Sequence, residues 1–96
     1  MKKSLLILLL CSGNLFAQLS DQQFFSTYKD GVNLFEQARY DEAFTRLSTL
    51  TTKNHNNAVA PYAYLYAAQA AEKKGSKYQA KILYRNLLTY YPDWDK

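Results

Sequence analysis

A repeated pattern of small and bulky residues constrains the fold of this 96-residue chain more than any other feature. With Ala43 and Ala80 taken as equivalent, the pattern recurs at an interval of 37 residues. Small residues precede each alanine by twelve and five positions, and bulky ones follow it by four and seven; the pairs are Gly31 and Ala68, Ala38 and Gly75, Leu47 and Tyr84, and Leu50 and Leu87. Small residues let two helices cross closely, because a larger side chain would force the backbones apart. The pattern therefore predicts two similar helical hairpins.

The first predicted hairpin covers residues 18–57. Ser20 and Gln23 form a capping-box pattern, and apolar residues then recur at helical spacing, which predicts a helix over about 20–37. A second helix begins near Asp41, because acidic residues favour the positive end of the helix dipole, and it ends near Thr52.

The second predicted hairpin covers residues 58–96. Pro61 suits the first position of a helix, where its missing N–H is not needed, and Gly75 can take the left-handed conformation that ends it. Ser76 and Gln79 repeat the capping-box pattern, and Pro92 stops the fourth helix. Only three Gly and two Pro are present, so composition also favours an all-α fold.

The first seventeen residues have the organisation of a secretory signal peptide. Met1–Lys3 is basic, Leu5–Leu10 is an aliphatic run, and Ala17 is the small residue that precedes a cleavage site. We therefore expect an exported protein that begins at Gln18, either periplasmic or envelope-associated. Two alternatives are an uncleaved anchor and a lipoprotein acylated on Cys11, although Leu10 stands where a lipobox has Gly, Ala or Ser. Only these alternatives imply membrane contact.

The charge balance argues against a nucleic-acid partner. The chain has 12 basic and 8 acidic residues, and removal of Lys2 and Lys3 leaves ten basic residues against eight acidic ones. Four lysines cluster near the predicted corner between the third and fourth helices: Lys73, Lys74, Lys77 and Lys81. We interpret this cluster as a solvated corner that suits a helix C-terminus, the alternative being contact with an anion or a membrane headgroup.

No residue constellation points to catalysis, a metal or another cofactor. His55 is the only histidine, and its Asn neighbours place it in a solvated loop. Asp93 and Asp95 lack the spacing of a calcium loop, and Gly31 and Gly75 are too isolated to cradle a phosphate. The sequence therefore predicts a protein that is not an enzyme.

The pattern resembles the tetratricopeptide repeat (TPR), a helical pair of about 34 residues with small, aromatic and proline positions at set offsets. The residues that carry the resemblance are Gly31, Leu34, Ala38, Tyr40, Ala43 and Leu47 in the first half, and Tyr64, Ala67, Ala68, Ala71, Gly75, Ala80, Tyr84, Leu87 and Pro92 in the second. Three positions depart from the family pattern: Asp30 replaces a leucine, His55 replaces the closing proline, and Tyr78 lies one place late. The resemblance covers about residues 24–92.

This resemblance implies a non-catalytic protein–protein interaction module of the bacterial cell envelope. In the family, the first helices of stacked pairs line an inner face that receives an extended or helical peptide. The corresponding residues are Phe25, Tyr28, Val32, Phe35, Tyr62, Leu65, Tyr66, Gln69 and Glu72. Tyr28, Val32 and Phe35 share a stripe that can equally pack against the neighbouring pair. A clamp for a terminal carboxylate is disfavoured, because Tyr28, Val32 and Tyr66 occupy positions where such adaptors carry polar or basic residues.

An alternative is that the chain forms the N-terminal portion of a longer TPR solenoid, with no binding role of its own. Asp93–Lys96 has the pattern of another helix start, with Asp93 as its cap. The predicted face of the fourth helix, with Leu83, Leu88, Tyr90 and Tyr91, has no polar capping helix after it. We therefore expect self-association through that face or marginal stability.

Overall fold

The computed structural model describes residues 20–52 and 56–95. These residues contain four α-helices and no strand: α2 (Asp21–Glu36), α3 (Tyr40–Ser48), α4 (Ala60–Lys73) and α5 (Lys77–Tyr90). The predicted all-α class is therefore confirmed. The signal peptide, the lipidation candidate Cys11 and the loop residue His55 lie outside the described residues.

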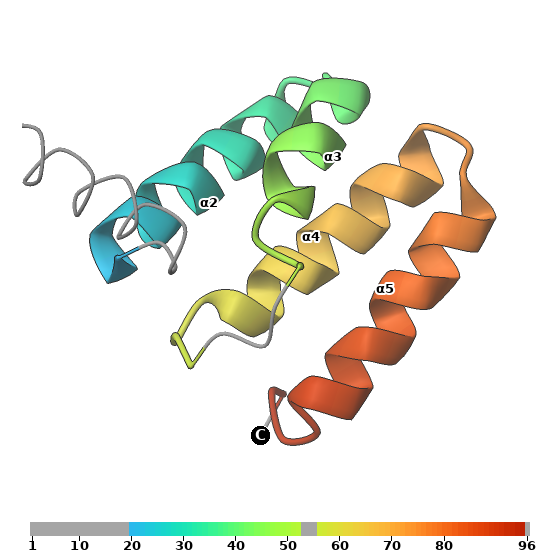
Figure 1. Cartoon of the computed structure of the whole chain (residues 1–96). Helices are drawn as coiled ribbons and strands as arrows, with labels where there is room; N and C mark the ends of the chain where they lie inside the picture. Colours follow the sequence, from blue (N-terminus) through green and yellow to red (C-terminus); the bar gives the residue numbers. More distant parts are fainter. Residues whose placement is uncertain (1–19, 53–55, 96) are drawn as a thin grey trace, which may run out of the picture.

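The helices follow one another as a layered series (Figure 1). Helices α2 and α3 run in opposite directions, as do α4 and α5. Helices α2 and α4 point the same way. Helix α3 packs against both α2 and α4, and α4 also packs against α5. Direct contact between α2 and α4 is more limited. Helix α3 therefore connects α2 and α4, which are the first helices of the two hairpins and touch each other only over a small area.

Helix α4 forms the centre of the core because it is apolar on several sides. Its buried residues are Ala60, Ala63, Tyr64, Ala67, Ala68, Ala70 and Ala71. Six of the seven are alanines, so neighbouring helices can approach its backbone closely. A helix that contacts partners on two sides must be apolar over more than one stripe, which this composition provides.

The 37-residue correspondence holds in the packing. Gly31 and Ala68 are both buried, as are Ala43 and Ala80. A Cβ atom on Gly31 would lie 2.5 Å from both Cγ and Cδ2 of Leu47, which is itself fully buried. The small residue at position 31 is therefore required for α2 and α3 to meet at this distance.

The turns inside the two hairpins are alike. Gly75 has a φ of 93°, as predicted, and Ala38 has the same left-handed conformation with a φ of 62°. In the first turn, the N–H groups of Ala38 and Arg39 donate to the carbonyl oxygens of Phe35 and Leu34 at 2.9 and 3.0 Å. In the second turn, Gly75 and Ser76 donate to Glu72 and Ala71 at 3.1 and 2.8 Å. Both turns are Schellman motifs, which satisfy carbonyl groups left free at a helix end.

The first predicted capping box is confirmed, and the second is wrong. Ser20 Oγ accepts from the Gln23 N–H, and Gln23 Oε1 accepts from the Ser20 N–H, both at 3.1 Å. Ser76 makes no capping bond with its side chain. Its backbone, at φ −104° and ψ 81°, belongs to the Schellman turn, whereas Ser20 has the extended ψ of 161° that suits a cap.

Two helix ends differ from the predicted positions. Helix α3 ends at Ser48 rather than near Thr52, and the Leu50 and Thr51 N–H groups then donate to the Leu47 and Ser48 carbonyls, three residues earlier, both at 3.0 Å. Ser48 Oγ donates to the Phe44 carbonyl at 2.5 Å and Thr51 Oγ1 to the Ser48 carbonyl at 2.9 Å. At the start of α4, Pro61 takes the second helical position, after Ala60.

After Pro92, where the sequence pattern predicts another helix start, the described residues contain no further helix. Residues 92–95 form a turn, in which the Trp94 N–H donates to the Tyr91 carbonyl at 3.1 Å. The turn brings the Trp94 ring back to the edge of the Tyr62 ring, with centroids 5.9 Å apart. The indole therefore packs on α4.

Candidate functional site

Aromatic side chains of α2 and α4 meet in a continuous row. Phe25 lies beside Tyr28 with ring centroids 6.4 Å apart. Across the helix boundary, the Tyr66 ring of α4 meets the edges of Tyr28 at 6.1 Å and Phe35 at 5.5 Å. We call Phe25, Tyr28, Phe35 and Tyr66 the aromatic row. Sequence reasoning selected all four residues, and the structure brings them together.

The aromatic row is fixed on one side and accessible on the other. Three of its rings are half-buried: those of Tyr28, Phe35 and Tyr66. They pack against the larger core cluster, called the main core, which is formed by Ala43, Leu47, Tyr64, Ala67, Ala68, Ala70, Leu83 and Leu87. Phe25, in contrast, retains 47% of its accessible surface. Burial, followed by the neighbouring rings of Tyr66 and Tyr62, raises the pKa of Tyr28. A protonated tyrosine hydroxyl such as this one can both donate and accept a hydrogen bond. The rings form a rigid apolar surface with polar tips.

The other candidates have varied surroundings. Tyr62 keeps 40% of its surface exposed, while Val32, Leu65 and Gln69 are half-buried. Leu65 also packs against the main core. These side chains extend the apolar surface, but less exposed area is left for a partner than their sequence positions suggest.

Glu72 is exposed and interacts with α5. The Tyr84 hydroxyl donates to Glu72 Oε1 at 2.8 Å. Burial and this hydrogen bond raise the pKa of Tyr84 to about 12. The Glu72 carboxylate therefore ties α4 to α5, a structural role that the sequence did not indicate.

A hollow of about 420 Å³ lies beside Tyr62, at the end of the molecule where α5 stops. It is lined by Asn56, Asn57, Ala58, Pro61, Tyr62, Tyr91, Pro92, Asp93 and Trp94. Sequence reasoning missed the contribution of Trp94, because a contact between Tyr62 and a residue 32 positions away leaves no periodic signal. The sequence signal that could have indicated this contact is the large apolar side chain of Trp94, four residues after the end of α5.

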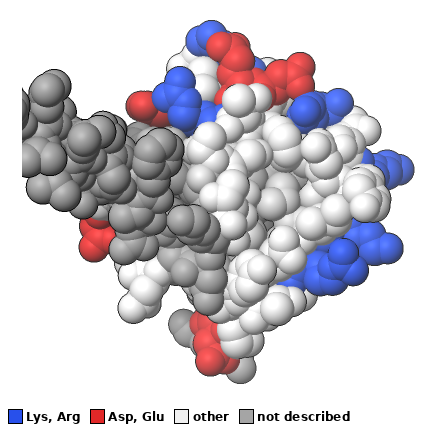
Figure 2. Space-filling model, in the orientation of Figure 1, with Lys and Arg blue, Asp and Glu red and all other residues white. Residues whose placement is uncertain are grey.

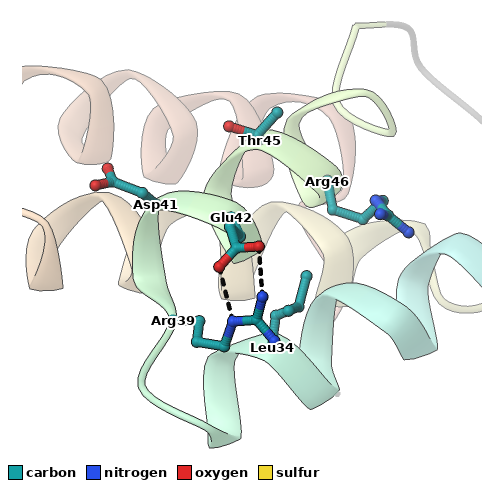
Figure 3. A pocket seen from close by; sticks show the side chains of 6 residues that line it. All are labelled: Leu34, Arg39, Asp41, Glu42, Thr45 and Arg46. Atoms are coloured by element: carbon teal, nitrogen blue, oxygen red, sulfur yellow. Dashed lines mark hydrogen bonds and ion pairs between the residues drawn. The ribbon is translucent and has the colours of Figure 1, made fainter.

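A second hollow, of about 400 Å³, lies near the turn between α2 and α3 (Figure 3). Its lining residues are Leu34, Arg39, Asp41, Glu42, Thr45 and Arg46. Arg39 Nε and Nη2 each donate to a Glu42 oxygen at 2.7 Å. The Arg39 guanidinium and the Glu42 carboxylate thus pair at an exposed site, where an ion pair adds little to the stability of the fold.

The lysine cluster divides into two parts. Lys73, Lys77 and Lys81 are exposed, with Lys73 in the last turn of α4. Lys74 instead contacts α3: its Nζ lies 3.4 Å from Asp41 Oδ1 and 4.4 Å from the centroid of the Phe44 ring. On the face shown in Figure 2, a group of basic side chains lies along the edge formed by α5. All four lysines are therefore exposed, and Lys74 in addition contacts α3.

The C-terminal helix face that was expected to drive self-association is only partly exposed. Leu83 is 8% exposed, and Tyr91 is half-buried with its ring 5.7 Å from that of Tyr64. Leu88 and Tyr90 remain 61% and 43% exposed. Part of this face therefore belongs to the internal core.

The described residues hold no group of three or more His, Cys, Asp or Glu side chains arranged to bind a metal ion. Among the same residues, no helix has both the length and the apolar character required to cross a bilayer. Comparison of the chain with protein-family models, curated proteins and solved structures gives no match.

Proposed function

We propose that this chain is a non-catalytic protein–protein interaction module of the bacterial cell envelope, exported by its N-terminal segment. In this proposal, two TPR-like hairpins bind a segment of a partner protein on the inner surface formed by α2 and α4. The observation that carries the proposal is the aromatic row, in which Tyr66 of α4 meets Tyr28 and Phe35 of α2. The 37-residue correspondence and the matching turns support the repeat architecture.

The chemistry of this surface favours a partner segment with apolar side chains. Phe25 and Tyr62 are large side chains with much of their surface in water, at 47% and 40% exposure. Burying them against a partner gains about 25 cal/mol for each Å² of apolar area removed from water. Because Tyr28 and Tyr66 already pack against each other, little side-chain entropy is lost on binding. Aromatic residues held in this way are typical of binding hot spots.

A peptide selection tests the proposal. Twelve-residue peptides are selected from a displayed library on the full chain, and the affinity of the best peptide is measured by calorimetry. Phe25→Ala and Tyr62→Ala should each weaken binding about tenfold, since truncation of a hot-spot residue removes at least about 1.4 kcal/mol. Tyr90→Ala is the matched control, because Tyr90 is a 43% exposed aromatic residue on α5 and lies outside the aromatic row.

A peptide whose affinity falls with Tyr90→Ala but not with Phe25→Ala or Tyr62→Ala would overturn the assignment of the surface. The alternative function, a structural portion of a longer solenoid, is favoured by Leu88, whose side chain is 61% exposed on α5. In that case no selected peptide would bind the aromatic row, and Phe25→Ala and Tyr62→Ala would change the stability of the chain without changing any peptide affinity.

A further inference from the structure

One stripe of α5 is exposed along its length. Tyr78, Lys81, Arg85 and Leu88 are spaced three, four and three residues apart, so they lie on one side of the helix. All four are exposed, Tyr78 at 76% and Leu88 at 61%. We call them the outer stripe of α5. It has two basic residues between two apolar ones, and α5 contains no Asp or Glu.

The equivalent positions of the first hairpin lie partly against α4. Positions 37 residues earlier are Asp41, Phe44, Ser48 and Thr51. Lys74, the residue directly after α4, pairs through its Nζ with Asp41 Oδ1 at 3.4 Å and lies 4.4 Å from the Phe44 ring centroid. At the other end, the Tyr64 hydroxyl of α4 donates to the Thr51 carbonyl at 3.1 Å. In the first hairpin these positions therefore contact the next helix and its C-terminal end, although the Asp41 side chain stays 84% exposed.

The opposite end of the molecule cannot supply that helix from a second copy. Helix α4 clusters with α3 through alanines, and the positions 37 residues earlier in α2 are all polar: Gln23, Ser26, Asp30 and Asn33 correspond to Ala60, Ala63, Ala67 and Ala70. These four α2 residues are exposed. A polar outer face of this kind caps a helical stack, and it offers no apolar stripe for α5 of another copy.

We propose that the outer stripe of α5 docks an acidic amphipathic helix of a partner protein. On α3 the acidic Asp41 receives the basic Lys74, whereas on α5 the stripe itself is basic, so the docking helix must bring carboxylates. Lys81 and Arg85 pair with those carboxylates, and Tyr78 and Leu88 pack against apolar residues of the same helix. The stripe runs over eleven residues, from Tyr78 to Leu88, or about 15 Å of helix, which matches a short docked helix. This surface is separate from the aromatic row and does not depend on the function proposed for it.

The experiment uses the full chain, labelled with ¹⁵N, and three synthetic peptides. The first peptide is an amphipathic helix with a Leu/Ala stripe flanked by Glu, the second has Lys at every Glu position, and the third has the composition of the first in scrambled order. The Glu helix should bind and shift the amide signals of Tyr78, Lys81, Arg85 and Leu88, whereas the other two peptides should not. The double variant Lys81→Glu with Arg85→Glu should weaken the Glu helix at least tenfold and bind the Lys helix instead.

The controls separate the proposal from its rivals. Lys29→Glu changes one exposed charge on α2 and should leave the affinity for the Glu helix within twofold of the parent. If circular dichroism shows that the double variant has lost helix, Lys81→Gln and Arg85→Gln replace it. Equal binding of the Glu helix and its scrambled form, or unchanged affinity in the charge variants, would overturn the proposal. Binding to vesicles with one third anionic lipid in place of the Glu helix would assign the stripe to a membrane surface. A dimer detected by sedimentation that buries Leu88 would assign it to a second copy.

Discussion

Ala38 and Gly75 occupy the same left-handed position in the two hairpin turns, with φ values of 62° and 93°. The two turns use the same pair of backbone hydrogen bonds, although only one of them has the residue that this conformation favours. A Cβ atom in the left-handed region approaches the following carbonyl oxygen, which costs about 1–2 kcal/mol. The first turn therefore holds conformational strain that the second lacks.

This difference predicts opposite effects of two substitutions. Ala38→Gly should raise the free energy of unfolding by about 0.5–1 kcal/mol, since relief of strain exceeds the added flexibility of the unfolded chain. Gly75→Ala should lower it by about 1 kcal/mol, and nothing lies within 4 Å of the added Cβ, so the loss is conformational. Urea unfolding monitored by circular dichroism measures both values. Changes of the same sign in the two variants would contradict the equivalence of the turns.

Gly31 and Leu47 form a second testable pair. Alanine normally stabilises a helix interior by about 1 kcal/mol relative to glycine, but a Cβ on Gly31 would lie 2.5 Å from Leu47 Cγ. Gly31→Ala should therefore destabilise the chain by about 1–3 kcal/mol through overpacking. Leu47→Ala should destabilise it by about 2–5 kcal/mol, because Leu47 is fully buried.

The double variant distinguishes overpacking from other causes. Leu47→Ala removes the side-chain atoms that a Cβ at position 31 would contact, so the combined loss should be smaller than the sum by at least about 1 kcal/mol. Thermal and urea unfolding of the four proteins in this cycle provide the measurement. Strict additivity would mean that the two side chains do not meet as described.

Two serines in similar sequence patterns should respond differently to substitution. Ser20→Ala removes the hydroxyl that accepts from the Gln23 N–H, and it should cost about 1 kcal/mol of stability. Ser76→Ala should change stability by less than about 0.5 kcal/mol, because the Ser76 side chain makes no capping bond. Equal losses in the two variants would show that Ser76 caps α5 in solution.

Much of the fold follows from local patterns in the sequence. The small residues at Gly31 and Ala80, the left-handed Gly75 and the capping box at Ser20 each depend on a nearby backbone requirement. Such requirements restrict residue type strongly, so the residue type reveals the local structure. The aromatic row was also accessible to sequence reasoning, because the periodicity of α2 and α4 places its members on neighbouring faces.

Features that depend on distant contacts or on competition between bonds could not be predicted. At the early end of α3 the backbone changes to turn bonds, in which the Thr51 N–H donates to the Ser48 carbonyl, and no residue type in the sequence marks that change. Trp94 packs on Tyr62, and Glu72 accepts a bond from Tyr84, through tertiary contacts that have no fixed spacing. Ser76 has the right sequence pattern for a cap, but the preceding turn sets its backbone.

The buried tyrosines predict a loss of stability at alkaline pH. Burial, and next the neighbouring Tyr91 and Tyr90, raises the pKa of Tyr64 to about 12 from an ordinary value of 10.0. Burial, and next the hydrogen bond to Glu72, raises the pKa of Tyr84 to about 12. Between pH 10 and pH 12 the unfolded chain releases these protons while the folded chain keeps them. Because the unfolded state then binds fewer protons, the free energy of unfolding falls as pH rises through this range.

Urea unfolding at a series of pH values, with tyrosinate absorbance recorded in parallel, measures this effect. Stability contributed by these two groups should be fully present below pH 10 and should decline steeply towards pH 12. In Tyr84→Phe the free energy of unfolding should fall less steeply with pH, by the equivalent of about one bound proton, since the substitution removes one group that the folded state keeps protonated. Leu88→Ala, at an exposed and non-titrating position of the same helix, should leave the slope unchanged. A slope that is identical in the parent and in Tyr84→Phe would contradict the bond between Tyr84 and Glu72, and with it the contact that joins α4 to α5 at that point.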